Sequence, residues 1–166
     1  MPTATYTPLA NVTLGTAAAS VTFSSIPATY RDLILVIQSG AVGNDSNVRL
    51  RFNGDTGSNY SYVRMFGTGS GSGSSDSTTS TGFQAARQTA NNVGGFGMGV
   101  VNIMDYSATD KHKTALVRSG LASEITMAHA ARWANTAAVT SITLLGFELG
   151  TNFLAGSRFD LYGVIA

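Results

Sequence analysis

Cysteine is absent from the 166-residue sequence, and charged residues make up only 11% of it. Without cysteine the chain cannot form disulfides, bind metal through thiolates or use a cysteine nucleophile. The charged share compares with roughly 25% in typical globular proteins, and small neutral polar residues take its place. Because charge keeps proteins apart in solution, this composition suits a protein whose faces are covered by neighbouring molecules, or an extracellular β-protein.

Three further absences restrict the possible partners of the protein and the compartment in which it is made. A net charge of +1 gives no basic patch of the kind that nucleic acid requires, so we expect no nucleic-acid partner. No stretch approaches the ~18 consecutive apolar residues of a membrane helix, and we expect no membrane partner. The first fifteen residues lack the basic and apolar regions of a secretory signal. We therefore expect synthesis in a cytoplasm.

The stretch VTFSSIPATYRDLILVIQS, residues 21–39, predicts two strands and the corner between them. Val21 and Phe23 alternate with polar residues, as in a half-buried strand. Pro27 ends that strand, because proline has no amide hydrogen to donate to a neighbouring strand. Residues 33–37 are apolar throughout and rich in β-branched side chains. This pattern predicts a strand in the middle of a sheet, buried on both faces.

Similar short runs recur with turn residues at intervals of about ten. The clearest is residues 47–52, in which Val48, Leu50 and Phe52 point inward. Near the end of the chain, residues 158–166 alternate with Phe159, Leu161 and Ile165 inward. About ten short strands with this spacing predict one all-β domain over residues 1–166, an antiparallel β-sandwich of the jelly-roll type. The other runs predicted as strands are residues 3–13 (with a break near Pro8), 60–66, 83–89, 98–104, 113–119 and 139–147.

Residues 67–82, GTGSGSGSSDSTTSTG, are of low complexity. This composition predicts a flexible Gly/Ser-rich loop. We expect contact with a neighbouring subunit to fix the conformation of this loop. The residues that we predict to contact such a neighbour are Gly67, Gly69, Ser70, Ser74 and Asp76.

Residues 123–134, SEITMAHAARWA, fit two secondary structures. Ser123 is a good helix cap and the alanines favour a helix. The alternating residues from Ile125 to Trp133 also line one face of a strand. We predict a strand, since residues 135–137 then form a hairpin turn to the strand at 139–147.

Candidate catalytic and metal-binding residues are few. His112 and His129 are far apart in sequence, and neither has partners at metal-ligand spacing. We interpret His112 as an exposed turn residue and His129 as a packed one. The serines between glycines at residues 69–73 match a nucleophile motif in composition only. Nine scattered carboxylates select no catalytic pair. We expect no enzymatic activity and no cofactor or metal.

Two other ligand classes remain as alternatives. A carbohydrate-binding module would expose aromatic rings for stacking on sugars, and Tyr60, Tyr62 and Trp133 are the candidates. Each also fits a role as strand or core packing. Asp45 and Asp55, like Asp76, lie in turn-rich sequence that can supply oxygen ligands for calcium, but their spacing matches no calcium-binding loop. We therefore expect these aspartates to form turns.

Two stretches resemble small virion proteins of tailed bacteriophages. Residues 21–39 are similar to an F-s-s-I-P-x-x-Y-x-D-L opening in that family. Residues 140–166, TSITLLGFELGTNFLAGSRFDLYGVIA, are similar to its closing segment. The resemblance covers about a third of the chain and includes no catalytic residues. It implies a β-sandwich structural protein, commonly a homotrimer, that decorates or cements the capsid or belongs to a fibre or tail.

From this resemblance we expect a capsid decoration or cement protein that docks on the head lattice as an oligomer. Its partners would be copies of itself and other virion proteins such as the major capsid protein. It would be located in the virion after assembly in the host cytoplasm. The alternative is a tail-fibre or receptor-binding carbohydrate-binding module.

Overall fold

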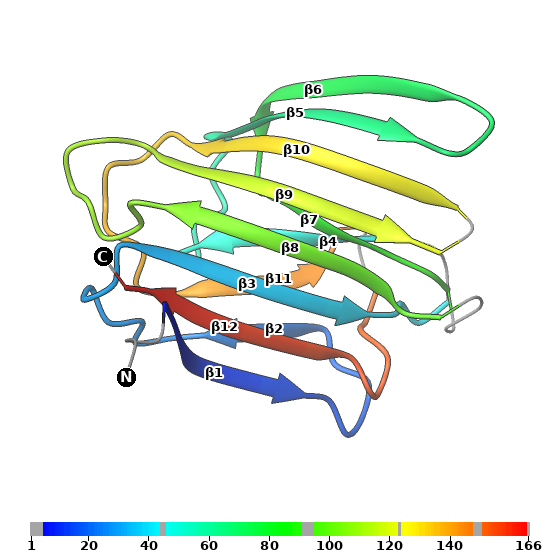
Figure 1. Cartoon of the computed structure of the whole chain (residues 1–166), viewed down its shortest axis with the longest axis horizontal. Helices are drawn as coiled ribbons and strands as arrows, with labels where there is room; N and C mark the ends of the chain where they lie inside the picture. Colours follow the sequence, from blue (N-terminus) through cyan, green and yellow to red (C-terminus); the bar gives the residue numbers. More distant parts are fainter. Residues whose placement is uncertain (1–4, 44–45, 91–94, 123, 148–150, 166) are drawn as a thin grey trace.

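Two antiparallel sheets, one of eight strands and one of four, form the computed structural model of this chain (Figure 1). The structure describes residues 5–43, 46–90, 95–122, 124–147 and 151–165. The predicted all-β, antiparallel sandwich of jelly-roll type is confirmed. The strands are β1 Tyr6–Thr13, β2 Ser20–Phe23, β3 Asp32–Ser39, β4 Ser46–Phe52, β5 Tyr60–Gly67, β6 Ser72–Ser80, β7 Phe83–Gln88, β8 Gly97–Met104, β9 Lys113–Leu121, β10 Ile125–Trp133, β11 Ile142–Gly146 and β12 Arg158–Val164.

The larger sheet has the strand order β1-β12-β3-β8-β9-β10-β5-β6, and the smaller has the order β2-β11-β4-β7. Figure 1 shows the eight strands side by side from β1 to β6, with the smaller sheet behind the middle of the larger one. The smaller sheet therefore covers one face of the larger sheet and leaves the other face open. We call the open side the outer face.

The core lies between the sheets and follows the period-2 alternation of the strands. Val48, Leu50 and Phe52 of β4 are fully buried, as predicted. They meet the inward residues of β3, of which Leu33 and Leu35 are also fully buried. The alternation read from the sequence therefore places the core correctly wherever one face of a strand is covered.

Three details of the strands differ from the prediction. The β3 side chains Ile34 and Val36 are half-buried, because the outer face of the sheet has no covering layer. Ile165, predicted to point inward, follows the end of β12 and is 39% exposed. The break predicted near Pro8 is a bulge, since β1 is continuous from Tyr6 to Thr13 and only its register with β12 shifts between Pro8 and Ala10.

The predicted loop at residues 67–82 is wrong. Residues 72–80 form β6, which pairs with β5 and is the edge strand of the larger sheet. A short turn joins the two strands, in which the Thr68 amide donates to the Gly71 carbonyl oxygen. Backbone hydrogen bonds to β5 hold this segment, so its side chains need not favour a strand.

The strand predicted within residues 123–134 is confirmed as β10, but the hairpin predicted after it is wrong. β10 pairs with β9 and β5 in the larger sheet, whereas β11 lies in the smaller sheet. The connection between β10 and β11 crosses from the larger sheet to the smaller one, and backbone hydrogen bonds fix its position. Ala134 donates its amide hydrogen to Asn59, and Val139 donates to Tyr106.

Candidate functional site

The outer face around β10 carries the most distinctive surface of the molecule. Alternation turns the side chains of Met127, His129 and Trp133 into the sandwich, where they are buried. The same alternation turns Ala128 and Ala130 outward, where they are exposed. These two alanine side chains project less from the sheet than the side chains of the neighbouring strands, so the middle of β10 forms a depression in the outer face.

The strands on either side of β10 carry larger outward side chains. Val63 of β5 and Leu116 of β9 both pair with Ala130. One row further along, Ala128 lies between Met65 of β5 and Arg118 of β9. Each row thus runs from a large residue to a small one and back to a large one. This pattern forms a groove along β10.

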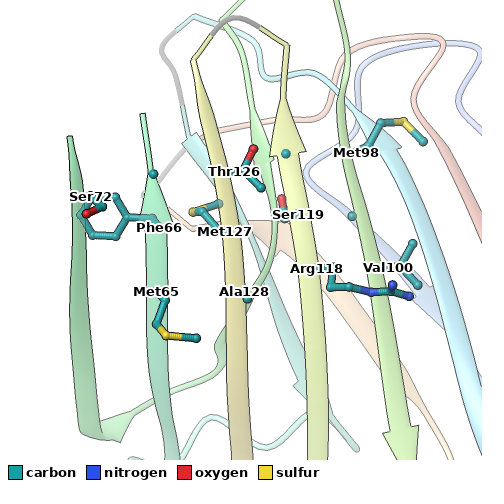
Figure 2. A pocket seen from close by; sticks show the side chains of 13 residues that line it. Met65, Phe66, Ser72, Met98, Val100, Arg118, Ser119, Thr126, Met127 and Ala128 are labelled. Atoms are coloured by element: carbon teal, nitrogen blue, oxygen red, sulfur yellow. The ribbon is translucent and has the colours of Figure 1, made fainter. Parts of the chain in front are cut away.

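Three adjoining hollows of about 760, 210 and 380 Å³ follow each other along this groove. The first and second share Met65 and Ala128, and the second and third share Val63, Leu116 and Ala130. Figure 2 shows the first hollow, with Met65 beside Ala128 and the Arg118 side chain extending towards Val100. We call the three hollows together the β10 groove.

The walls of the β10 groove are apolar although they face solvent. Met65 is 63% exposed, Val63 57% and Leu116 49%. Met98 of β8, which lines the first hollow, is 46% exposed. Large apolar side chains that gather on one exposed face are typical of a surface that contacts another protein.

Three charged residues border the β10 groove and form no ion pair with any described residue. Arg118 of β9 and Asp76 of β6 lie on opposite sides of β10, Arg132 lies on β10 itself beyond Ala130, and all three are exposed. The ion pairs that the described residues do form lie elsewhere, for example between Arg87 and Glu124. The groove therefore has basic and acidic groups on opposite sides.

Two of the three residues predicted for sugar stacking cannot take that role. Tyr60 and Trp133 lie in the core and are 0% and 1% exposed. Their rings stack on each other, with centroids 6.2 Å apart. Burial raises the pKa of Tyr60 to about 12. Both strands turn these residues inward under the smaller sheet, so the prediction is wrong for them.

The third of these residues, Tyr62, is half-buried on the inner face and stacks on His129. His129 is 4% exposed, as predicted for a packed residue, and neither ring nitrogen has a hydrogen-bond partner among the described residues. Burial lowers its pKa to about 4, and the charge of Arg64 acts in the same direction. The imidazole is therefore neutral at pH 7. His112 is exposed, as predicted.

The residues predicted as a contact loop are spread along one hairpin. Gly67 ends β5, Gly69 and Ser70 form the turn, and Ser74 and Asp76 belong to β6. Ser74 pairs with Met65 and Asp76 with Val63. Two of the five therefore lie next to the wall of the β10 groove. Their contact with a neighbouring subunit stays a prediction.

No group of three or more metal-binding side chains occurs among the residues that the structure describes. Asp55 makes a local turn, as expected, because its Oδ1 accepts a hydrogen bond from the Gly57 amide at 2.8 Å. Asp45 lies outside the described residues. Among the described residues, no helix is long and apolar enough to cross a membrane.

No family model and no curated protein matches the chain. Among solved structures, the galectin LEC-6 of Caenorhabditis elegans has a TM-score of 0.37 to this chain at 10% sequence identity. The match covers 94% of this chain and 96% of the galectin. A likeness this distant carries no argument about what the chain binds.

The β10 groove was not predicted from the sequence. Part of its signal is present, because Val63 and Met65 alternate with polar or aromatic residues in a segment predicted as a strand. The sequence also shows that Ala128 and Ala130 share one face of the strand predicted within residues 123–134. The pairing of β5 with β10 is not visible, and that pairing makes the groove.

Proposed function

We propose that this chain is a non-enzymatic structural protein of a bacteriophage virion, a capsid decoration or cement protein that docks on the head lattice as an oligomer. The observation that carries the proposal is the β10 groove, with Val63, Met65 and Leu116 exposed along its walls. Exposed apolar surface of this kind is stabilised when another protein covers it. Its partners would be copies of itself and the major capsid protein.

The sequence supports the same function. Residues 21–39 and 140–166 resemble the opening and closing segments of small phage virion proteins, which are commonly homotrimers. A charged share of 11% gives little repulsion between copies, which favours a protein that acts within an assembly. Modest contacts made by each copy become strong when the copies are linked on a lattice.

The alternative, a tail-fibre or receptor-binding carbohydrate module, has less support. It needs exposed aromatic rings beside a shallow site. Tyr60 and Trp133 are buried, and Tyr62 packs on His129 from inside the sandwich. No observation on the outer face favours a saccharide over a protein partner.

The experiment that tests the proposed function is co-sedimentation of the purified protein with phage heads that lack it. We expect binding that saturates at a fixed number of copies per head, set by the lattice. Heads of an unrelated phage are the control and should bind no protein. Absence of saturable binding to the cognate heads would overturn the proposal. Retention on a glycan array without head binding would support the carbohydrate module instead.

A further inference from the structure

We propose that the β10 groove is a contact between two copies of this chain, related by a twofold axis that runs parallel to the strands between β5 and β10. The inference deepens the proposed function, because it names the surface through which the oligomer forms. A twofold contact uses the same patch on both copies, so the patch must be complementary to itself. The shape and the charge of the groove both meet this requirement.

The shape is self-complementary because of the strand order. The strands β6, β5, β10 and β9 are adjacent, and neighbouring strands are about 4.8 Å apart. The proposed axis therefore places β5 over the partner's β10, and β6 over the partner's β9. Residues of one row stay in that row, since the axis is parallel to the strands.

The large residues of one copy then meet the small residues of the other. Val63 falls opposite the partner's Ala130, and Met65 falls opposite the partner's Ala128. Symmetry repeats the same two contacts, so in all four places a large side chain of one copy packs over an alanine of the other. Because the axis is parallel to the strands, the strands of the two copies run parallel to each other, and two sheets that pack face to face lie about 10 Å apart.

The charges are complementary under the same axis. Asp76 shares a row with Val63 and therefore falls over the partner's β9, next to the partner's Leu116. The next outward residue on that strand is the partner's Arg118. Neither Asp76 nor Arg118 has an ion-pair partner among the described residues of its own chain. The contact thus brings together opposite charges at both of its borders.

The composition of the groove suits such a contact. Cores of protein interfaces are enriched in methionine and arginine and poor in other charged residues. Met65 and Met98 are exposed here, and Arg118 is the charged residue that lines the first hollow. A ring of three copies would need two different patches that fit each other. The self-complementary groove therefore points to an even-numbered assembly in place of the homotrimer implied by the resemblance.

The first test is the mass of the purified protein in solution, measured by sedimentation equilibrium over a range of concentrations. We expect a dimer for the wild type and a monomer for Met65→Lys, since the lysine would bury a charge against the partner's Ala128. The control is Met104→Lys, which changes an exposed methionine of β8 that lines none of the three hollows. It should remain a dimer. A monomeric wild type, or a trimer unaffected by Met65→Lys, would overturn the inference.

The second test exchanges the charges. Asp76→Arg and Arg118→Asp should each raise the dimer dissociation constant by about tenfold, because each places like charges together. The double variant restores opposite charges and should recover most of the affinity. Two single effects that simply add in the double variant would contradict the proposed pairing. Circular dichroism and unfolding curves check that the variants fold like the wild type.

The mass measurement and the head-binding experiment can fail independently. A wild-type monomer that saturates cognate heads would overturn the twofold contact and leave the proposed function standing. In that case the groove would be occupied by the major capsid protein, and Met65→Lys would reduce head binding. A wild-type dimer that ignores the heads would overturn the proposed function and leave the contact in place.

Discussion

The indole of Trp133 and the carboxylate of Asp55 are joined at one end of the sandwich. Nε1 of Trp133 donates a hydrogen bond of 2.7 Å to Oδ2 of Asp55. The same oxygen accepts a bond of 2.8 Å from the Asn59 side chain. Trp133 ends β10, and Asp55 lies in the loop between β4 and β5. The pair therefore ties a strand of the larger sheet to a loop that leaves the smaller one.

We expect Asp55→Ala to lower the free energy of unfolding by about 2–3 kcal/mol at pH 7, because it leaves the buried indole N–H without a partner. The Asn59 hydrogen bond lowers the pKa of Asp55 below 3.8, although burial opposes it. The stabilisation by the charged form is therefore present above pH 4 and is lost as the pH falls through the folded pKa. Chemical denaturation at pH 7 and pH 3 measures both effects. Asp110→Ala, at an exposed aspartate, should change the stability by less than ~0.5 kcal/mol.

His129 predicts a separate loss of stability in mild acid. Its pKa is about 4 in the folded protein, against 6.5 for the free side chain. Between these values the unfolded chain binds more protons, so the free energy of unfolding falls as the pH is lowered from 6.5 towards 4. We expect this group to account for about 2–3 kcal/mol of the difference between pH 7 and pH 4.5.

The variant His129→Leu tests the assignment, since leucine keeps an apolar body beside Tyr62 and Arg64 but does not titrate. Its free energy of unfolding should change much less between pH 7 and pH 4.5 than that of the wild type. An unchanged pH dependence in this variant would show that another group causes the acid sensitivity.

Gly99 of β8 is expected to tolerate no side chain. A methyl group at this position would overlap the carbonyl oxygen of Ala85 and the side chain of Ala86 on β7. The glycine lets β7 approach the larger sheet closely. We expect Gly99→Ala to destabilise the fold by at least ~2 kcal/mol. Gly15→Ala is the matched control, because a methyl group there meets no atom within 4 Å, and its midpoint of unfolding should hardly move.

Asn53 holds the end of β4 to the connection that leads into β11. Its Oδ1 accepts hydrogen bonds from the amides of Thr140 at 2.8 Å and Ser141 at 3.1 Å, and its Nδ2 donates to the Ala138 carbonyl oxygen at 2.8 Å. Its φ of 51° lies in the left-handed region. Glycine adopts this region freely, whereas alanine does so at a cost.

We therefore expect Asn53→Gly to lower the free energy of unfolding by about 2–3 kcal/mol through the lost hydrogen bonds. Asn53→Ala should cost about 1 kcal/mol more because of its backbone strain. Equal losses in the two variants would show that the backbone conformation relaxes and stores no strain.

The sequence by itself determined the fold class and the inward face of most strands. The alternation of Val48, Leu50 and Phe52 was sufficient because one face of β4 is covered and the other is not, and period-2 patterns report that difference directly. The same reasoning identified β10 in spite of its alanines and placed His129 in the interior. These inferences need only the neighbours along the chain.

Only the tertiary structure decided which strands lie side by side. β6 has the composition of a flexible linker, and it is a strand because β5 supplies its hydrogen bonds. The aromatic residues Tyr60 and Trp133 are buried because the smaller sheet covers that part of their strands. The β10 groove exists because β5 pairs with β10 on the side opposite β9, although β5 comes from a distant part of the sequence. Strand pairing across such distances depends on how the whole chain closes its core, which no local pattern records.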